Sequence, residues 1–393
     1  MKNSTITRYA SLVLVIGFFV SCSSTKFSVD NLVDQENYQE AIDKISIEIS
    51  KNPSSSLYFQ KGKVHGLAAQ KDTVINRKSS YQSMISAFDS ALVYQTELAD
   101  NSIEEEIDSL NNYYWNLEHQ TGLKEYESGT EQSLQTAIAH FNNAIVIDSE
   151  KVESYKSLSI ALYNNDDLDG AINTLKKAES INNADSEVSE NLGFLYLEMG
   201  NPEQSIFYYQ KANQDPLKNK NIAFGLVNAY ISQNRTSEAV TFLDQLIEEY
   251  PKEAKLHNVY GTQLYIQVSE LFSNLKTSYA SNDTSAAQTL RVEIEGLSQN
   301  AEEQLVEAYK LDDSSIEFTE SLAVFYNNMS GNYFSLYKSA FDSDKDDIKT
   351  KALSLTDFAL DYYKKLVELN SENDSYSTKI DNLNKLKNSW TNQ

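Results

Sequence analysis

The chain has 393 residues, a hydrophobic content of 40% and a formal net charge of −24 at pH 7. Its apolar content excludes a disordered chain, and so strongly acidic a surface excludes nucleic-acid binding because it repels phosphates. With 12 Gly, 4 Pro and no Val- or Ile-rich runs that alternate with period two, the sequence predicts an almost entirely helical protein.

The first 22 residues differ in composition from the rest of the chain. Lys2 and Arg8 precede the apolar run ASLVLVIGFFV, which ends just before Ser21-Cys22. This run is shorter than the about 20 residues that span a bilayer, and it fits the hydrophobic segment of a secretory signal. We therefore predict a signal peptide over residues 1–21, with a buried N-terminal helix as the alternative.

The sequence FVSC, residues 19–22, resembles the lipobox of bacterial lipoproteins, in which a small residue precedes a lipidated cysteine. Cys22 is the only cysteine of the chain, so no internal disulfide can form. The resemblance implies a mature chain that starts at lipidated Cys22, followed by a tether over residues 22–36. Because Ser23 follows Cys22 and no acidic run comes next, the resemblance also implies anchoring in the outer membrane of a bacterial envelope, facing the periplasm.

A period of 34 residues runs through the middle of the chain. Small residues recur at Ala137, Ala171, Ser205 and Ala239, and large residues follow four places later at Phe141, Leu175, Tyr209 and Leu243. Spacings of three and four place each set on one face of a helix. Gly193 and Ala212 belong to these repeats, and we expect them to be small because helix backbones pass close to them.

This period resembles the tetratricopeptide repeat, a helix-turn-helix unit that stacks into a solenoid. The resemblance implies an all-α protein: a right-handed α-solenoid of about seven repeats over residues 37–372, closed by a capping helix over 373–393. It says little about the ligand, since the same repeat serves many partners.

Two repeats near the C-terminus contain extra residues with helical spacing. Leu264, Val268 and Leu275 continue one apolar stripe, and Leu290 and Ile294 resume it after the sequence SNDTS. A similar pattern covers residues 326–358, where the acidic sequence DSDKDD marks the tip. We therefore expect two lengthened helical hairpins, 264–300 and 326–358, that project from the solenoid and form a second partner-contact surface, with the acidic tip as a solvated turn. The alternative is that an arm serves only to pack on its neighbour.

The residue patterns indicate no catalytic, metal or cofactor site. The four histidines, at 65, 119, 140 and 257, include no pair at a spacing of three or four. The sequence NDDLDGA, residues 165–171, begins like a calcium loop, but Lys176 stands where the loop needs a glutamate. No nucleophile elbow or phosphate-binding glycine loop occurs, so we expect a protein that is not an enzyme and has no cofactor.

The remaining candidate for a functional feature is a surface that recognises a partner. The resemblance implies a concave face formed by fixed positions of the first helix of each repeat. In the three uninterrupted repeats these positions include the candidate partner-binding residues Lys156, Tyr163, Glu190, Phe194, Glu198, Phe224 and Asn228. Alternating aromatic and polar residues suit an extended peptide or a partner's helix. For Phe194 and Phe224 the alternative is packing between repeats.

We therefore predict an envelope-anchored, non-catalytic adaptor or scaffold. Its partner is expected to be another envelope protein or peptide segment, and its membrane contact is expected to be the lipid anchor. The alternative is a glycan-binding lipoprotein of the starch-utilisation type, because those proteins also set helical repeats of this kind behind a lipidated cysteine. They are larger and carry a loop-rich sugar-binding region, whereas this chain has only Trp115 and Trp390 as tryptophans.

Overall fold

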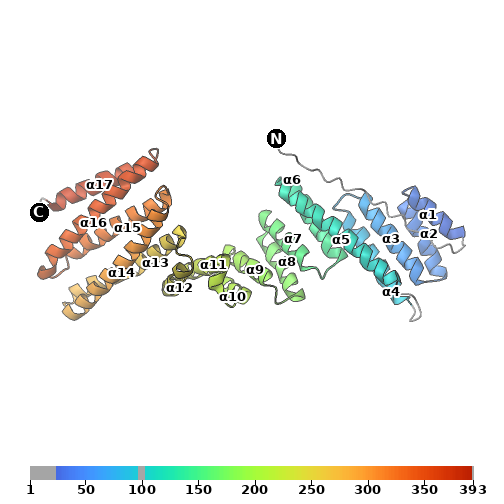
Figure 1. Ribbon diagram of the computed structural model, residues 1–393, viewed down its shortest axis with the longest axis horizontal. Coiled ribbons are helices and arrows are strands. Elements are labelled where there is room, and N and C mark those ends of the chain that lie inside the picture. The colour runs from blue at the N-terminus through green and yellow to red at the C-terminus, as the bar shows by residue number, and fades with distance from the viewer. Residues whose placement is uncertain (1–23, 96–101, 392–393) are drawn as a thin grey trace. The chain divides into compact units, whose positions relative to one another are not determined.

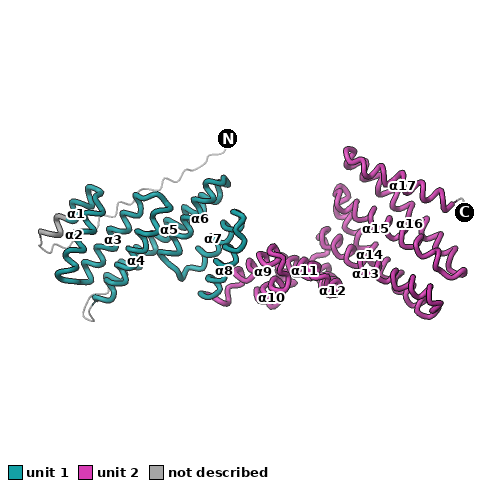
Figure 2. The backbone as a smooth tube through the Cα atoms, turned by 180° about the vertical axis from the view of Figure 1, so that it is seen from behind, with its two compact units in different colours: residues 1–181 teal, residues 182–393 magenta. Residues whose placement is uncertain are grey.

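The computed structural model describes residues 24–95 and 102–391 (Figure 1). These ranges contain seventeen α-helices, one short 3-10 helix and no strand, which confirms the all-helical solenoid prediction. They divide into two compact units, residues 1–181 and residues 182–393 (Figure 2). Within the described ranges, no helix combines the length and the apolar character needed to cross a bilayer. The predicted signal peptide and Cys22 lie outside the described residues.

Unit 1 is a stack of antiparallel helix pairs. Its helices are α1 (Ser24–Asp34), α2 (Tyr38–Lys51), α3 (Ser55–Lys71), α4 (Arg77–Val93), α5 (Ser102–Ser128), α6 (Glu131–Ile147), α7 (Val152–Asn164) and α8 (Leu168–Ile181). Local sequence sets where several of them begin. Ser54 accepts a hydrogen bond from the backbone N–H of Leu57 at the start of α3, and Thr130 and Ser133 form a capping box at the start of α6.

The segment predicted as a tether, residues 22–36, is largely helical. Ser24–Asp34 form α1, and its Val29 and Leu32 are buried against Ala41 and Ile45 of α2. This contact covers part of the apolar face of α2. The described ranges thus hold eight helix pairs, α1/α2 to α15/α16, where the sequence predicts about seven.

Unit 2 continues the same pairing and ends with one further helix. Its elements are α9 (Ser186–Glu198), α10 (Pro202–Ala212), the 3-10 helix η1 (Pro216–Lys218), α11 (Lys220–Ser232), α12 (Thr236–Glu249), α13 (Ala254–Ala280), α14 (Thr284–Leu311), α15 (Ile316–Tyr337), α16 (Asp342–Leu369) and α17 (Asp374–Thr391). Helix α17 lies where the sequence predicts a capping helix, and it buries Tyr376 and Leu383 against the core of this unit.

The small residues of the repeat make room for aromatic rings as well as for helix contacts. The sequence predicts that Gly193 is small because backbones pass there, but the space beside it is filled by the ring of Tyr209 from α10. A Cβ atom on Gly193 would lie 2.8 Å from Tyr209 Cδ1, and one on Gly225 of α11 would lie 2.2 Å from Tyr209 Cζ. In unit 1, the ring of Phe88 likewise fills the space beside Gly62.

The two lengthened hairpins exist, but they pack on each other instead of standing clear. They are α13/α14 and α15/α16, and both views show them side by side (Figures 1 and 2). The rings of Phe272 and Tyr333 meet edge to face with centroids 5.0 Å apart, and those of Tyr279 and Phe341 do so at 4.9 Å. The apolar stripes of the extra residues are therefore used in a shared core.

Candidate functional site

The predicted partner-binding residues lie on the first helices of three pairs, and these helices belong to different units. Lys156 and Tyr163 are half-buried on α7 of unit 1. The other five lie on two helices of unit 2 that contact each other: Glu190, Phe194 and Glu198 on α9, and Phe224 and Asn228 on α11. The structure brings these five together, and we call them the α9/α11 surface.

The α9/α11 surface presents one exposed aromatic ring among polar groups. Phe194 is 38% exposed, Glu198 and Asn228 are also exposed, and Glu190 accepts a hydrogen bond of 3.3 Å from Nδ2 of Asn219 at the start of α11. Phe224 is half-buried and packs against the core of unit 2, so the packing alternative holds for much of this side chain. Phe194 is therefore the aromatic group of this surface that a partner can best reach.

The buried side chain of Tyr209 supports the α9/α11 surface. Tyr209 lies under it between Gly193 and Gly225, and burial, reinforced by the carboxylates of Glu190 and Glu198, raises the pKa of Tyr209. The tyrosine hydroxyl therefore stays neutral at physiological pH. A buried ring held between two glycines fixes the distance between α9 and α11, and with it the spacing of the exposed groups.

Sequence reasoning missed a buried charged cluster in unit 1. Glu118 of α5 has no exposed surface, and it accepts hydrogen bonds from Arg77 Nη1 at 2.9 Å and Tyr81 Oη at 2.8 Å on α4. His140 Nδ1 at 2.6 Å and Asn143 Nδ2 at 3.2 Å, both on α6, donate to its other oxygen. The cluster thus joins three helices, and its burial makes it a structural feature of the solenoid.

The charge of Glu118 is maintained by its donors. Burial by itself would raise the pKa of this carboxyl, but hydrogen bonds from His140, Tyr81 and Arg77 outweigh burial and bring the pKa below its ordinary value of 4.5. No sequence signal pointed to this cluster, because Glu118 is separated from its four partners by 22 to 41 residues. Helical periodicity relates only residues a few positions apart.

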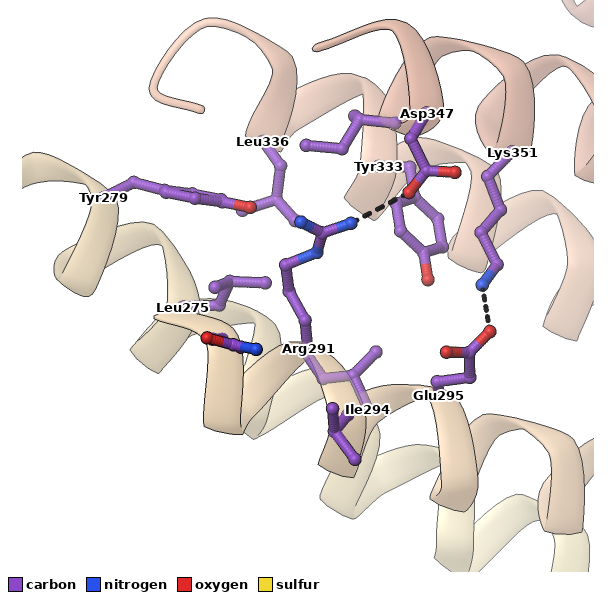
Figure 3. Close-up of a pocket in the computed structure, with 12 residues that line it drawn as sticks. Leu275, Tyr279, Arg291, Ile294, Glu295, Tyr333, Leu336, Asp347 and Lys351 are labelled. Atoms are coloured by element: carbon purple, nitrogen blue, oxygen red, sulfur yellow. Dashed lines mark hydrogen bonds and ion pairs between the residues drawn. The ribbon is translucent and has the colours of Figure 1, made fainter. Parts of the chain in front are cut away.

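A pocket of about 350 Å³ lies between the two lengthened hairpins (Figure 3). Arg291 of α14 reaches across it to Asp347 of α16 at 2.9 Å, and Lys351 of α16 reaches back to Glu295 of α14 at 3.0 Å. Leu275 and Ile294 are among the apolar side chains that line it. Both cations of the pocket are already paired with carboxylates, so these contacts connect the two hairpins and leave no cation unpaired for a ligand.

The acidic tip is also different from the expected solvated turn. Asp342 and Asp344 lie in the first turn of α16, where carboxylates are favoured by the helix dipole. Asp344 pairs with Arg291 Nη1 at 2.9 Å and accepts a hydrogen bond of 3.0 Å from the hydroxyl of Tyr279. The tip of one hairpin is therefore attached to the other hairpin.

The structure offers little support for a sugar site or a metal site. Trp115 is 9% exposed, stacks on His119 and donates its indole N–H to Ser154, and Trp390 packs on Phe334. Neither ring is therefore a free stacking platform for a glycan. In the part of the chain that the structure describes, no group of three His, Cys, Asp or Glu side chains is placed to hold a metal ion.

Comparison with known proteins agrees with this architecture. Residues 196–261, which contain α10, α11 and α12, match the model of the tetratricopeptide repeat family. The described helices are thus stacked pairs of an α-solenoid that includes tetratricopeptide repeats. A search of curated proteins finds no match.

Several solved structures are similar to this chain at low identity. PilF of Pseudomonas aeruginosa is 14% identical with a TM-score of 0.43, over 68% of this chain and 97% of that one. YrrB, described as a TPR protein with an unusual peptide-binding site, is 14% identical with a TM-score of 0.40, over 61% of this chain and 96% of that one. MamA from Desulfovibrio magneticus RS-1 is 14% identical with a TM-score of 0.36, over 47% of this chain and 96% of that one.

Proposed function

We propose that this protein is a non-catalytic adaptor that binds another protein through the α9/α11 surface. The observation that carries the proposal is Phe194, a phenylalanine left 38% exposed on a first helix, with Glu198 and Asn228 also exposed on the same surface. An exposed aromatic ring surrounded by hydrogen-bonding groups is the arrangement that anchors a peptide segment. The lengthened hairpins are not part of this proposal, because their apolar stripes pack on each other.

The proposed place of action is the bacterial envelope. The support is the sequence pattern of residues 1–23: a predicted signal peptide over 1–21, Cys22 as lipidation site, and Ser23 in the position that favours the outer membrane, facing the periplasm. The partner is then another envelope protein, and the lipid supplies the membrane contact. Metabolic labelling with palmitate tests the anchor, because the label should be lost in Cys22→Ala, and equal label in both chains would refute it.

Partner recovery tests the adaptor role. After cross-linking in the native envelope, Phe194→Ala should recover much less of any partner that the wild-type chain recovers. The matched control is Phe207→Ala, which removes a ring that is 54% exposed on the second helix α10 and should leave recovery unchanged. Full recovery with Phe194→Ala would rule out this surface, and so would an equal loss in both variants.

A further inference from the structure

A second pocket of unit 2, of about 310 Å³, lies between the first helices α13 and α15 and shares no residue with the α9/α11 surface. Its apolar side includes Tyr265 of α13 and Val324 and Phe325 of α15. The rings of Tyr265 and Phe325 meet edge to face with centroids 5.7 Å apart, and Val324 is 39% exposed. A side chain that entered the pocket would therefore contact both aromatic and aliphatic surface.

The acidic side of the pocket consists of two carboxylates that have few donors of their own. Glu317 is approached by Asn258 Nδ2 and Glu320 by Tyr376 Oη, each at the long distance of 3.5 Å. Neither carboxylate forms an ion pair with a basic residue of the described ranges. Two negative charges at the mouth of one pocket are thus left without a cation.

Two hydroxyl groups that line the pocket already use their hydrogens and are left as acceptors. Thr262 and Ser321 each donate their hydroxyl hydrogen to a backbone carbonyl one turn earlier, at 2.8 Å and 3.0 Å. Beside the pocket, Asn258 is 6% exposed and its Nδ2 points to Glu317.

We propose that the α13/α15 pocket binds the side chain of a lysine or arginine from an extended segment of the partner protein. The cation would lie between Glu317 and Glu320 with its N–H groups toward these acceptors, and its aliphatic stem would cover Val324 and the ring of Tyr265. The net charge of −24 further favours the approach of a basic segment. This inference rests on the proposed adaptor function and names the chemistry of the partner.

The test uses the full chain and two acetylated, amidated pentapeptides, Ala-Val-Arg-Val-Ala and the same peptide with citrulline in place of arginine. Citrulline keeps the shape of arginine and lacks its charge. The expected result is a saturable shift of the methyl NMR signals of Val324 and Thr262 with the arginine peptide, and affinity weaker by about tenfold for the citrulline peptide. Equal shifts with both peptides, or no saturable shift with either, would overturn the proposal.

Two double variants separate local binding from general charge attraction. Glu317→Gln with Glu320→Gln should weaken the arginine peptide by about tenfold. The control, Glu270→Gln with Glu293→Gln, removes the same charge from exposed positions of α13 and α14 and should change affinity little. Equal weakening in both would contradict a specific site. The adaptor proposal fails separately, through partner recovery with Phe194→Ala, which these titrations do not measure.

Discussion

The ring of Tyr209 lies so close to Gly225 that a Cβ atom on this glycine would come within 2.2 Å of Tyr209 Cζ. The ring cannot retreat, because Gly193 on α9 confines its other side. We therefore predict that Gly225→Ala destabilises unit 2 by about 1–3 kcal/mol, the usual cost of overpacking a tight core. Urea denaturation of the full chain, followed by circular dichroism, measures this loss.

Two other helical glycines of unit 2 provide the control. A Cβ atom on Gly296 of α14 or Gly331 of α15 would meet nothing within 4 Å. Either glycine changed to alanine should stabilise its helix by about 0.5–1 kcal/mol, since alanine has the higher helix propensity. If Gly225→Ala were as stable as Gly296→Ala, the confinement of the Tyr209 ring would be disproved.

The sequence was sufficient for the helices but not for every contact between them. The 34-residue period places Ser205 and Tyr209 on one helical face, since a helix relates residues a few positions apart. It does not say that the ring of Tyr209 fills the space beside Gly193, because that depends on how α9, α10 and α11 stack. Likewise the stripe through Leu275 showed that a face is buried, without showing that the neighbouring hairpin buries it.

For the candidate site, the sequence predicted which helix carries each residue but not how the helices are grouped. Repeat positions placed Phe194 and Asn228 on neighbouring first helices, and the structure has them on α9 and α11 of unit 2. They could not show that Lys156 belongs to the other unit, because unit division depends on contacts over the whole chain. Nor could they find the pocket of Glu317, whose unpaired carboxylate is evident only once the surrounding donors are placed.

Shortening the first lengthened hairpin should destabilise unit 2. Replacing residues 268–297 with a short Gly-Ser turn removes Phe272, Leu275 and Tyr279 and exposes Tyr333 of the neighbouring hairpin. Loss of each such side chain costs about 2–5 kcal/mol, so thermal unfolding of unit 2 should shift to a clearly lower temperature. A projecting arm with no packing role would predict an unchanged melting temperature.

The control for this change lengthens the same hairpin. Two glycines inserted after Ser281, in the turn between α13 and α14, keep all the packed side chains. Such insertions cost little, because loop entropy rises slowly with length. Equal destabilisation by the insertion and the deletion would mean that the turn, and not the packed stripe, determines stability.

Glu118→Gln should destabilise unit 1 by about 3–5 kcal/mol, because it removes the buried carboxylate with which the half-buried charge of Arg77 is paired. The difference from wild type should depend on pH. Since the folded-state pKa of Glu118 is below 4.5, its contribution is present above that pH and is lost as the pH falls through the folded pKa. Denaturation at pH 7 and pH 3 measures both effects. The control, Glu106→Gln at an exposed position of α5, should change neither.

His65 on α3 should make stability depend on pH in a higher range. Burial, with a further contribution from the charge of Lys61, lowers its pKa from 6.5 to about 4. Between these values the unfolded chain binds a proton that the folded chain does not, so the free energy of unfolding falls as the pH drops from 6.5 toward 4. Because His65 is only half-buried, solvent screening keeps the effect small.

Comparison of wild type with His65→Gln at pH 7 and pH 5 isolates this contribution, since at pH 5 Glu118 is still charged. The variant should lose less stability than wild type over that interval, because glutamine does not titrate. Lys61→Met should show an intermediate loss, since removing the nearby cation lets the pKa of His65 rise toward its ordinary value. Identical losses in wild type and His65→Gln would show that the folded chain protonates His65 as readily as the unfolded chain does.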